Sequence, residues 1–216
     1  DRRETECIRL EIHCRATRAL VGAMKQQLGL EQADVYLVDG PVELRSLMSV
    51  TQTDGFEDLR DEPWEPVPSP DVDIKESMFP QIAQGDILLV HPYDSFDPVV
   101  KFLNDAADDP QVLAIKQVLY RTASQSAIVE ALIRAAQVGK HVTVLIELKA
   151  RFDEARNISQ ARRLELAGAH VVYGVRSLKT HAKICLVVRR EPQGIVRYVH
   201  FGTGNYNEKT ATLYSD

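Results

Sequence analysis

The chain has 216 residues, of which 44% are hydrophobic and 26% are charged, as in ordinary soluble globular proteins. No apolar run reaches the roughly 18 residues of a membrane-spanning helix, and no signal-peptide pattern is present, which argues against an integral membrane protein. The three cysteines, Cys7, Cys14 and Cys185, lack metal-site spacing and are typical of a reducing cytoplasm. Because the chain starts at Asp1 and stops just past a motif, we expect a fragment of a longer cytoplasmic protein.

Charge is distributed unevenly along the chain. Residues 1–115 contain 10 basic and 23 acidic side chains, whereas residues 116–190 contain 14 basic and 5 acidic ones. A basic segment within an acidic chain favours an anionic ligand at that segment. A solvated basic helix face is the alternative, but several of these basic residues fall at the ends of predicted strands.

The first part of the chain predicts a small α+β unit. Its expected elements are strands at residues 5–14 and 35–38 and helices at residues 17–28 and 41–48. The first helix ends at Gly29, and the second begins at Pro41 and is expected to turn Leu44, Leu47 and Met48 inward.

A proline-rich stretch follows, with four prolines among residues 63–70. Such a segment is extended and cannot be helical. We therefore predict a domain boundary here, with a partial α+β domain and its linker in residues 1–66 and a second domain in residues 67–216.

The second domain predicts an α/β alternation. The expected strands are residues 86–90, 112–120, 142–148, 171–173, 182–188 and 195–201. The expected helices are residues 96–107, 127–138 and 159–166. Helices between apolar strands imply right-handed crossovers and a mostly parallel sheet flanked by helices. The last two strands are close enough in sequence to form a hairpin.

Residues 177–188 are the most informative stretch, a strand with one histidine and two lysines at its mouth. Because side chains alternate along a strand, His181 and Lys183 should point to the same face. A neutral imidazole nitrogen can attack phosphorus while a fixed ammonium offsets the charge on the phosphate oxygens. For this pair alone, a histidine that merely hydrogen-bonds is the alternative.

Two arginines follow the ends of successive predicted strands. Ligands of a parallel sheet bind beyond the carboxyl ends of its strands, so Arg121 and Arg151 should stand near each other on the ligand edge. Each guanidinium can grip two oxygens of one phosphate. Asp153, Glu154 and Arg156 come just after and are candidate orienting partners.

A glycine-rich turn, Gly202-Thr-Gly-Asn205, lets the backbone approach a ligand closely. Together with His181-Ala-Lys183, it resembles one half-site of the phospholipase D superfamily, whose members use a histidine nucleophile with lysine and asparagine around the phosphate. That superfamily usually has aspartate five positions after the lysine, where this chain has Val188. The difference argues against ordinary phosphodiesterase activity.

A closer resemblance covers nearly the whole chain. The blocks at residues 112–121, 147–154, 178–183 and 200–214 resemble the bacterial polyphosphate kinases that work through a phosphohistidine. In that family these blocks lie in the first of two phospholipase-D-like C-terminal domains. Residues 1–66 resemble the end of the family's head domain, down to the turn Val38-Asp-Gly-Pro41. The family's N-terminal domain, and its last domain with a second active-site histidine, lie outside this chain.

The resemblance implies a reversible transfer of the ATP γ-phosphate to inorganic polyphosphate, with His181 carrying the phosphoryl group. It also implies Mg²⁺, with Arg121 and Arg151 beside the metal. A guanidinium has no free acceptor for a cation, so these arginines are expected to grip the phosphate that the metal binds. The other implied phosphate-binding residues are Lys179, Lys183, Asn205 and Tyr214.

The implied partners are ATP, ADP and inorganic polyphosphate, with no nucleic acid. A homo-oligomer is expected for the full-length protein, and peripheral membrane association is compatible with it. The isolated chain is expected to be inactive, because half of the family's site is missing. A phospholipase-D-like phosphodiesterase and a non-catalytic module that binds a phosphate polymer stay open as alternatives.

Overall fold

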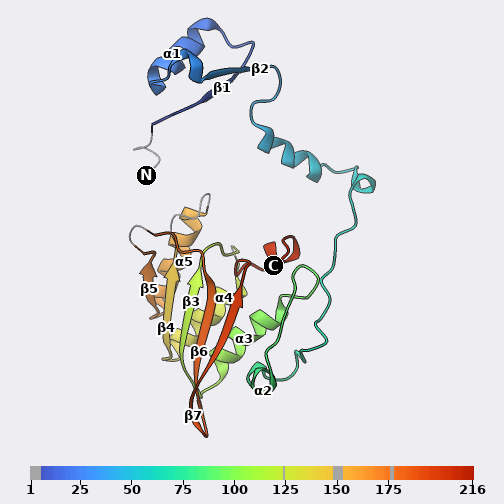
Figure 1. Cartoon of the computed structure of the whole chain (residues 1–216), viewed down its shortest axis with the longest axis vertical. Coiled ribbons are helices and arrows are strands. Elements are labelled where there is room, and N and C mark those ends of the chain that lie inside the picture. The colour runs from blue at the N-terminus through green and yellow to red at the C-terminus, as the bar shows by residue number, and fades with distance from the viewer. Residues whose placement is uncertain (1–5, 124, 148–152, 176–177) are drawn as a thin grey trace. The chain divides into compact units, whose positions relative to one another are not determined.

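The computed structural model describes residues 6–123, 125–147, 153–175 and 178–216 (Figure 1). The chain divides into two compact units, Asp1–Glu62 and Pro63–Asp216. The division falls within the proline-rich stretch, and the head-domain assignment of the first unit stays a prediction. Among the described residues, no helix is both long enough and apolar enough to cross a bilayer.

The first unit is built around a two-stranded parallel sheet. Its elements are β1 (Leu10–His13), α1 (Arg18–Leu28), a 3₁₀ turn (Gln32–Asp34), β2 (Val35–Val38) and two 3₁₀ segments (Leu44–Gln52 and Glu57–Leu59). Helix α1 connects the two strands, and both of its ends follow local sequence rules. The Thr17 hydroxyl accepts the Leu20 N–H at 3.2 Å, and Gly29 closes the helix at a φ of 66°, which favours glycine.

The helix predicted over residues 41–48 is wrong. A 3₁₀ segment forms over Leu44–Gln52, and the side chains of Leu44 and Met48 are 65% and 67% exposed. The hydroxyls of Ser46 and Ser49 donate to carbonyls three residues back, at 2.6 and 2.7 Å. Such local side-chain bonds compete with α-helical hydrogen bonding. None of the apolar residues of this segment is buried, so packing does not favour an α-helix here.

The second unit is a five-stranded sheet in the order β5-β4-β3-β6-β7. Its elements are α2 (Met78–Gln84), α3 (Asp97–Asp108), β3 (Val112–Leu119), α4 (Ala127–Gln137), β4 (His141–Ile146), α5 (Glu154–Leu166), β5 (His170–Tyr173), β6 (Lys183–Glu191), β7 (Gly194–Gly202) and a 3₁₀ turn (Thr210–Thr212). Strands β3, β4, β5 and β7 share one direction and β6 opposes them, which agrees with the expected mostly parallel α/β sheet.

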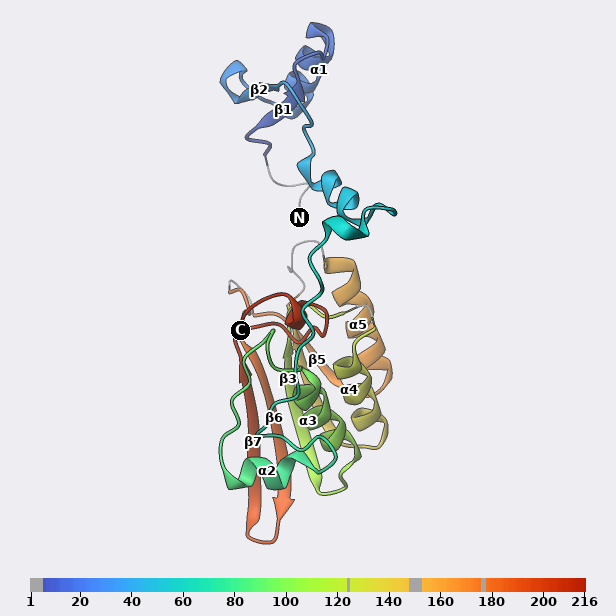
Figure 2. The same cartoon turned by 90° about the vertical axis from the view of Figure 1, so that its right-hand side faces the viewer.

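Helices α3, α4 and α5 lie along the same face of this sheet (Figure 2). The core forms between these helices and the strands, because each helix turns an apolar stripe toward the sheet. Leu103 on α3, Leu132 on α4, Leu164 on α5 and Val144 on β4 have no exposed surface. Helix α5 starts at Glu154, five residues earlier than predicted. The prediction missed the polar first turn, Glu154 to Asn157, because this turn shows no apolar periodicity.

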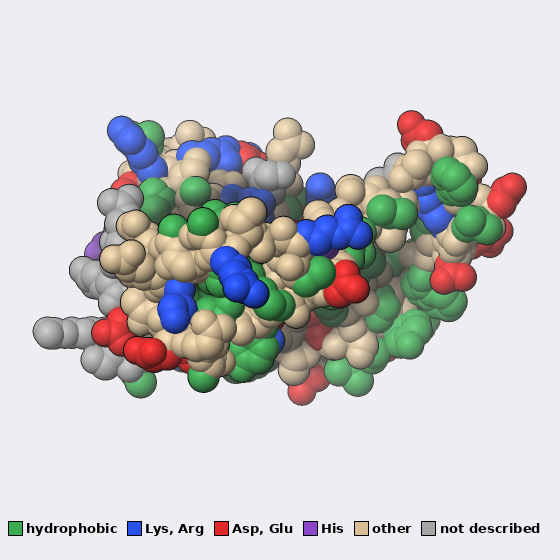
Figure 3. Space-filling model, turned by 90° about the horizontal axis from the view of Figure 1, so that it is seen from above, with side chains coloured by type: hydrophobic (Ala, Val, Ile, Leu, Met, Phe, Trp, Pro, Cys, Tyr) green, Lys and Arg blue, Asp and Glu red, His purple; other side chains and the backbone are tan. Residues whose placement is uncertain are grey.

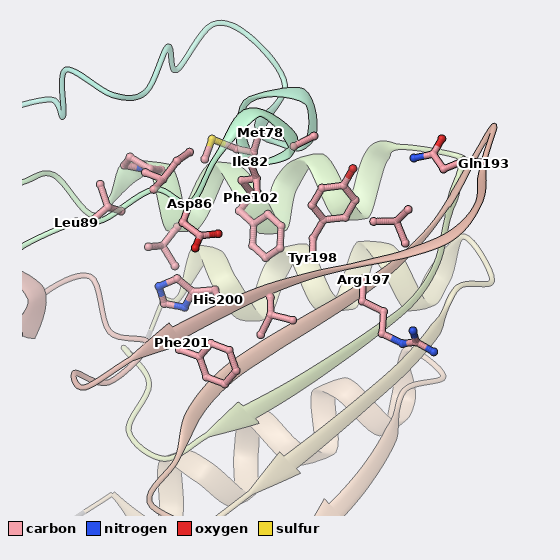
Figure 4. A pocket seen from close by; sticks show the side chains of 16 residues that line it. Met78, Ile82, Asp86, Leu89, Phe102, Gln193, Arg197, Tyr198, His200 and Phe201 are labelled. Atoms are coloured by element: carbon pink, nitrogen blue, oxygen red, sulfur yellow. The ribbon is translucent and has the colours of Figure 1, made fainter.

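The strand predicted over residues 86–90 is not formed. Within the described part of the chain, residues 86–89 make no backbone hydrogen bond. Their alternation is nevertheless real, since Ile87 and Leu89 pack against the core while Leu88 is 77% exposed. Ile87 and Leu89 also line a cavity of about 700 Å³ with residues of α2, α3 and β7 (Figure 4). The segment thus has the pattern of a strand without the neighbouring strand that would pair with it.

Candidate active site

The residues that the sequence singles out lie at one end of the sheet, the ligand edge, where β3, β4 and β7 end and β6 begins. Strands β3 and β4 run parallel and end at this edge, and β6 runs against them and therefore starts there. Strand β7 returns to the same edge, where Gly202 pairs with Lys183. The loops that meet here follow β3, β4 and β7 and precede β6. Figure 3 shows one face of the whole molecule, on which Lys and Arg side chains are interspersed with hydrophobic and acidic ones.

His181 and Lys183 are in contact, but not for the reason that the sequence suggested. Strand β6 begins at Lys183, so His181 lies in the preceding loop and strand alternation does not apply to it. The Lys183 Nζ lies 3.0 Å from Nε2 and 3.1 Å from Nδ1 of His181, and it donates to the His181 carbonyl at 2.7 Å. Lys183 is buried and His181 is exposed. A buried ammonium therefore holds an accessible imidazole in place.

Tyr120 is the shared neighbour of the basic side chains at this edge, and the sequence pattern does not single it out. Its ring packs edge-on to the His181 ring, with centroids 5.0 Å apart at 80°. The Nζ atoms of Lys179 and Lys183 lie 5.4 and 5.5 Å from its ring centre, and the Arg121 Cζ lies 5.7 Å away. Three cations around one ring repel each other, so an anion placed among them would be strongly favoured.

These cations also set the protonation of His181. The Lys183 ammonium lowers the pKa of His181 below its ordinary value, and partial desolvation, Lys179 and Arg121 lower it further. Burial likewise lowers the pKa of Lys183, and the Lys179 charge adds to the effect. At neutral pH the imidazole is therefore mainly in the neutral form that can act as a nucleophile.

Arg121 follows β3, where the sequence placed it. Its Nε lies 3.3 Å from Asp153 Oδ2, and Asp153 Oδ1 accepts a hydrogen bond from Arg156 at 2.7 Å. Asp153 is thus an orienting partner for both arginines. Arg151 lies outside the described residues, so its expected position beside Arg121 stays a prediction.

Two buried polar residues that the sequence did not single out tie the loops together. The Asn157 amide donates to the carbonyls of Tyr120 at 2.8 Å and Glu147 at 2.9 Å, which joins the ends of β3 and β4. The Glu147 carboxylate accepts the Thr180 N–H at 2.9 Å, which ties the β4 end to the loop that carries His181. Asn157 and Glu147 are 2% and 4% exposed.

Replacing Asn157 with alanine is expected to lower the free energy of unfolding by about 2 to 4 kcal/mol, because two buried carbonyls lose their donor. Urea unfolding of the purified chain, followed by circular dichroism, measures the change. The matched control is Asn104→Ala on α3. Within the described ranges the Asn104 amide oxygen accepts a single bond, from Arg134 at the surface, so this change should lower the free energy of unfolding by about 0.5 kcal/mol or less. Equal losses in the two variants would contradict the role given to Asn157.

The turn after β7 closes the remaining side of this edge. Gly204 packs so tightly that an added Cβ would meet the Asp216 carboxylate at 1.2 Å, so a side chain there requires Asp216 to move. Glu208 Oε1 accepts from the Ser126 hydroxyl at 3.1 Å and the Ala127 N–H at 2.8 Å, which caps α4.

Tyr214 is 64% exposed, and none of the contacts between described residues joins it to His181.

Several buried oxygens near this edge lack a hydrogen-bond donor among the described residues. They are Thr122 Oγ1, Thr180 Oγ1, Asn205 Oδ1 and Glu208 Oε2. Buried oxygens without a donor are rare in folded proteins, and they favour a ligand or ordered water at the site.

Two carboxylates at this edge, those of Asp153 and Glu147, are already engaged. Asp153 pairs with Arg121 and Arg156, and Glu147 accepts the Thr180 N–H. In the described ranges, no group of three metal-ligating side chains lies here. These donors do not form a protein cage for Mg²⁺, but they suit a Mg²⁺ ion carried by substrate phosphates and water, which is how this ion is often held.

Residues 77–216 match the sequence model of a family described as "Polyphosphate kinase C-terminal domain 1". The chain belongs to the polyphosphate kinase family. A polyphosphate kinase of Rhodopirellula baltica is 55% identical over the whole chain, which covers 25% of that relative. Polyphosphate kinase 1 of Chlorobaculum tepidum is 50% identical over the whole chain, which covers 31% of that relative.

A solved structure supports the same membership. The crystal structure of polyphosphate kinase from Porphyromonas gingivalis superposes with a TM-score of 0.76 at 32% identity, over 96% of this chain and 32% of that one. The expected phospholipase-D-like α/β fold is confirmed. The chain spans between a quarter and a third of the length of these family members.

Proposed function

We propose that the longer protein containing this chain is an ATP:polyphosphate phosphotransferase that works through a phosphohistidine at His181. The single observation that carries the proposal is an exposed imidazole, kept neutral by the buried Lys183, among cations at the edge of a polyphosphate kinase fold. Neutral imidazole is a nucleophile toward phosphorus, and clustered cations suit a polyanionic substrate.

The reaction is a double displacement. An imidazole nitrogen of His181 attacks the γ-phosphorus of ATP, an N–P bond forms, and the bond to the bridging oxygen breaks with its electron pair leaving on ADP. The other ring nitrogen gives its proton to solvent. A terminal oxygen of polyphosphate then attacks the phosphoramidate, and the N–P bond breaks with its electron pair returning to the imidazole, which takes back a proton from solvent. The transfer is reversible because the bonds at both ends are phosphoanhydrides.

The basic residues bind and orient the phosphates in this proposal. Lys183 lies within reach of both imidazole nitrogens and offsets charge on the moving oxygens. Arg121 binds phosphate oxygens while Asp153 orients its guanidinium. Arg151 is proposed to bind phosphate in the same way. These arginines hold the phosphates that carry Mg²⁺, and the ion, when bound, reduces the negative charge that the nucleophile meets.

The remaining assignments follow from family membership and position. Lys179, Asn205 and Tyr214 are proposed to contact substrate, and ATP, ADP and polyphosphate are the proposed partners. A cytoplasmic location, a homo-oligomer and peripheral membrane association are part of the same proposal for the full-length protein.

Incubating the full-length protein with γ-labelled ATP tests this function. Acid-labile label on the protein together with polymer formation supports it. Binding of polyphosphate without label would favour a non-catalytic module, and cleavage of a phosphodiester substrate would favour the phospholipase-D-like alternative. The isolated 216-residue chain should form little or no polymer, since it covers only a quarter to a third of its relatives.

Lys183→Gln is expected to raise the pKa of His181, because the largest cause of its lowered value is the Lys183 charge. A positive neighbour disfavours the imidazolium, so its removal lets His181 bind a proton at higher pH. Titration of the histidine ring protons by NMR in the purified chain measures the shift. His200, whose burial lowers its pKa to about 4, should not change and serves as the internal control. An unchanged His181 titration contradicts the electrostatic role of Lys183.

A further inference from the structure

Three metal-ligating side chains meet in the first unit, far from His181 in sequence. β1 and β2 pair in parallel, with His13 opposite Val38, and the Cys14 N–H donates to the Val38 carbonyl at 2.9 Å. The residue after each strand is Cys14 in one case and Asp39 in the other. The ligand atoms of His13, Cys14 and Asp39 all lie within 4.8 Å of one another.

The spacing of these donors is close to what zinc requires. The Cys14 Sγ lies 3.4 Å from Asp39 Oδ1 and 4.0 Å from His13 Nδ1. Around a tetrahedral Zn²⁺ with ordinary bond lengths, neighbouring donor atoms lie about 3.5 Å apart. These two distances are near that value, and the third pair, His13 and Asp39, lies within 4.8 Å, so side-chain shifts of up to about 1.5 Å would complete the coordination.

His13 carries its available lone pair on Nδ1, the ring nitrogen that lies 4.0 Å from Cys14 Sγ. His13 Nδ1 lies 3.0 Å from the Arg15 N–H and accepts its hydrogen bond, so in the neutral ring the proton is on Nε2. The Arg15 backbone is near the surface, and its N–H can bond to water when the lone pair turns to a metal. Cys14 and Asp39 are exposed, so an ion has direct access.

A metal bound by these three residues would lie across the ends of β1 and β2. It would join the two strands where their hydrogen-bonded ladder stops.

We infer that His13 Nδ1, Cys14 Sγ and Asp39 Oδ1 form a Zn²⁺ site with three protein ligands and a fourth position open to water. On binding, the Cys14 thiol releases its proton to the buffer and coordinates as thiolate. A thiolate ligand selects Zn²⁺ and similar soft ions over Mg²⁺, so this site is separate from the Mg²⁺ proposed to accompany substrate phosphates.

Co²⁺ titration of the purified, metal-free 216-residue chain tests the site, because cobalt bound to a thiolate absorbs in the near ultraviolet. We expect a band that saturates at one Co²⁺ per chain, disappears when Zn²⁺ is added and persists in excess Mg²⁺. Cys14→Ser should abolish the band, and Asp39→Asn should weaken binding by about tenfold or more while keeping the thiolate signal at high Co²⁺.

Cys7→Ser is the matched control, since among the described residues Cys7 Sγ bonds only to the Arg9 carbonyl, and the change should leave the titration unchanged. Circular dichroism of each variant checks that the two units stay folded. The absence of a band in the folded wild-type chain would overturn the inference. A band that survives Cys14→Ser, or one that is lost in Cys7→Ser, would overturn it equally.

Discussion

Replacing His181 with alanine in the full-length protein is expected to abolish both self-labelling by γ-labelled ATP and polymer synthesis. The imidazole is exposed, its pKa is lowered by Lys183, and the cations around Tyr120 surround it. Lys183 is the nearest other nitrogen, but it is buried and donates to the His181 carbonyl at 2.7 Å. It is therefore poorly placed to take over the phosphoryl group.

His170→Ala is the matched control for this experiment. His170 is exposed at the start of β5, and β5 runs parallel to β4, so it lies at the opposite edge of the sheet from His181. Labelling and synthesis should stay near wild type in this variant. Self-labelling that survives at normal stoichiometry in His181→Ala would place the nucleophile elsewhere. His200 is a poor substitute, because its Nδ1 lies 2.7 Å from the Tyr206 hydroxyl in a mostly buried position.

Changing Arg121 to lysine is expected to lower turnover of the full-length enzyme by about tenfold to a thousandfold, the range for loss of one preorganised donor. Lysine keeps the charge but removes the planar fork that can grip two phosphate oxygens. The same result is expected for Arg151→Lys. Stability should change by no more than about 0.5 kcal/mol, because the Arg121 side chain is 41% exposed and Asp153 keeps its bond to Arg156.

Turnover and melting temperature are measured together, with Arg134→Lys as the control. Arg134 lies in the last turn of α4, and its Nε is 3.8 Å from Asp108 at the edge of the sheet opposite the site. Its side chain is 45% exposed, close to the value for Arg121. The control therefore shows whether an arginine-to-lysine change at a similarly exposed position alters turnover or melting temperature away from the site. If the Arg121→Lys enzyme has wild-type turnover, the proposal that Arg121 binds two phosphate oxygens is wrong. If melting falls steeply with turnover, the arginine is structural.

The local sequence by itself determined much of this protein. The blocks at residues 112–121, 147–154, 178–183 and 200–214 indicate the polyphosphate kinase family, and the family comparison confirms this membership. Apolar periodicity located helices α3 and α4 and the long strands, because a buried stripe leaves a regular trace in the sequence. The end of α1 at Gly29 was equally readable, since the left-handed backbone there favours glycine.

Tertiary structure decided which residues meet. His181 reaches the ligand edge because β6 runs against β3, and strand direction has no signature in a short apolar run. Tyr120, Glu147 and Asn157 look like ordinary strand-end and helix residues in the sequence. Their part at the site depends on contacts with the loop before β6 and on the bonds that Asn157 makes across two loops.

The two incorrect elements have the same kind of explanation. Residues 86–90 have strand periodicity, but a strand also needs a hydrogen-bonding neighbour, and none pairs with residues 86–89 in the described chain. Residues 44–52 have the composition of a helix, but their serine hydroxyls bond to nearby carbonyls and none of their apolar residues with a described side chain is buried. Pattern and propensity are local properties, whereas pairing and burial depend on residues that are distant in the sequence.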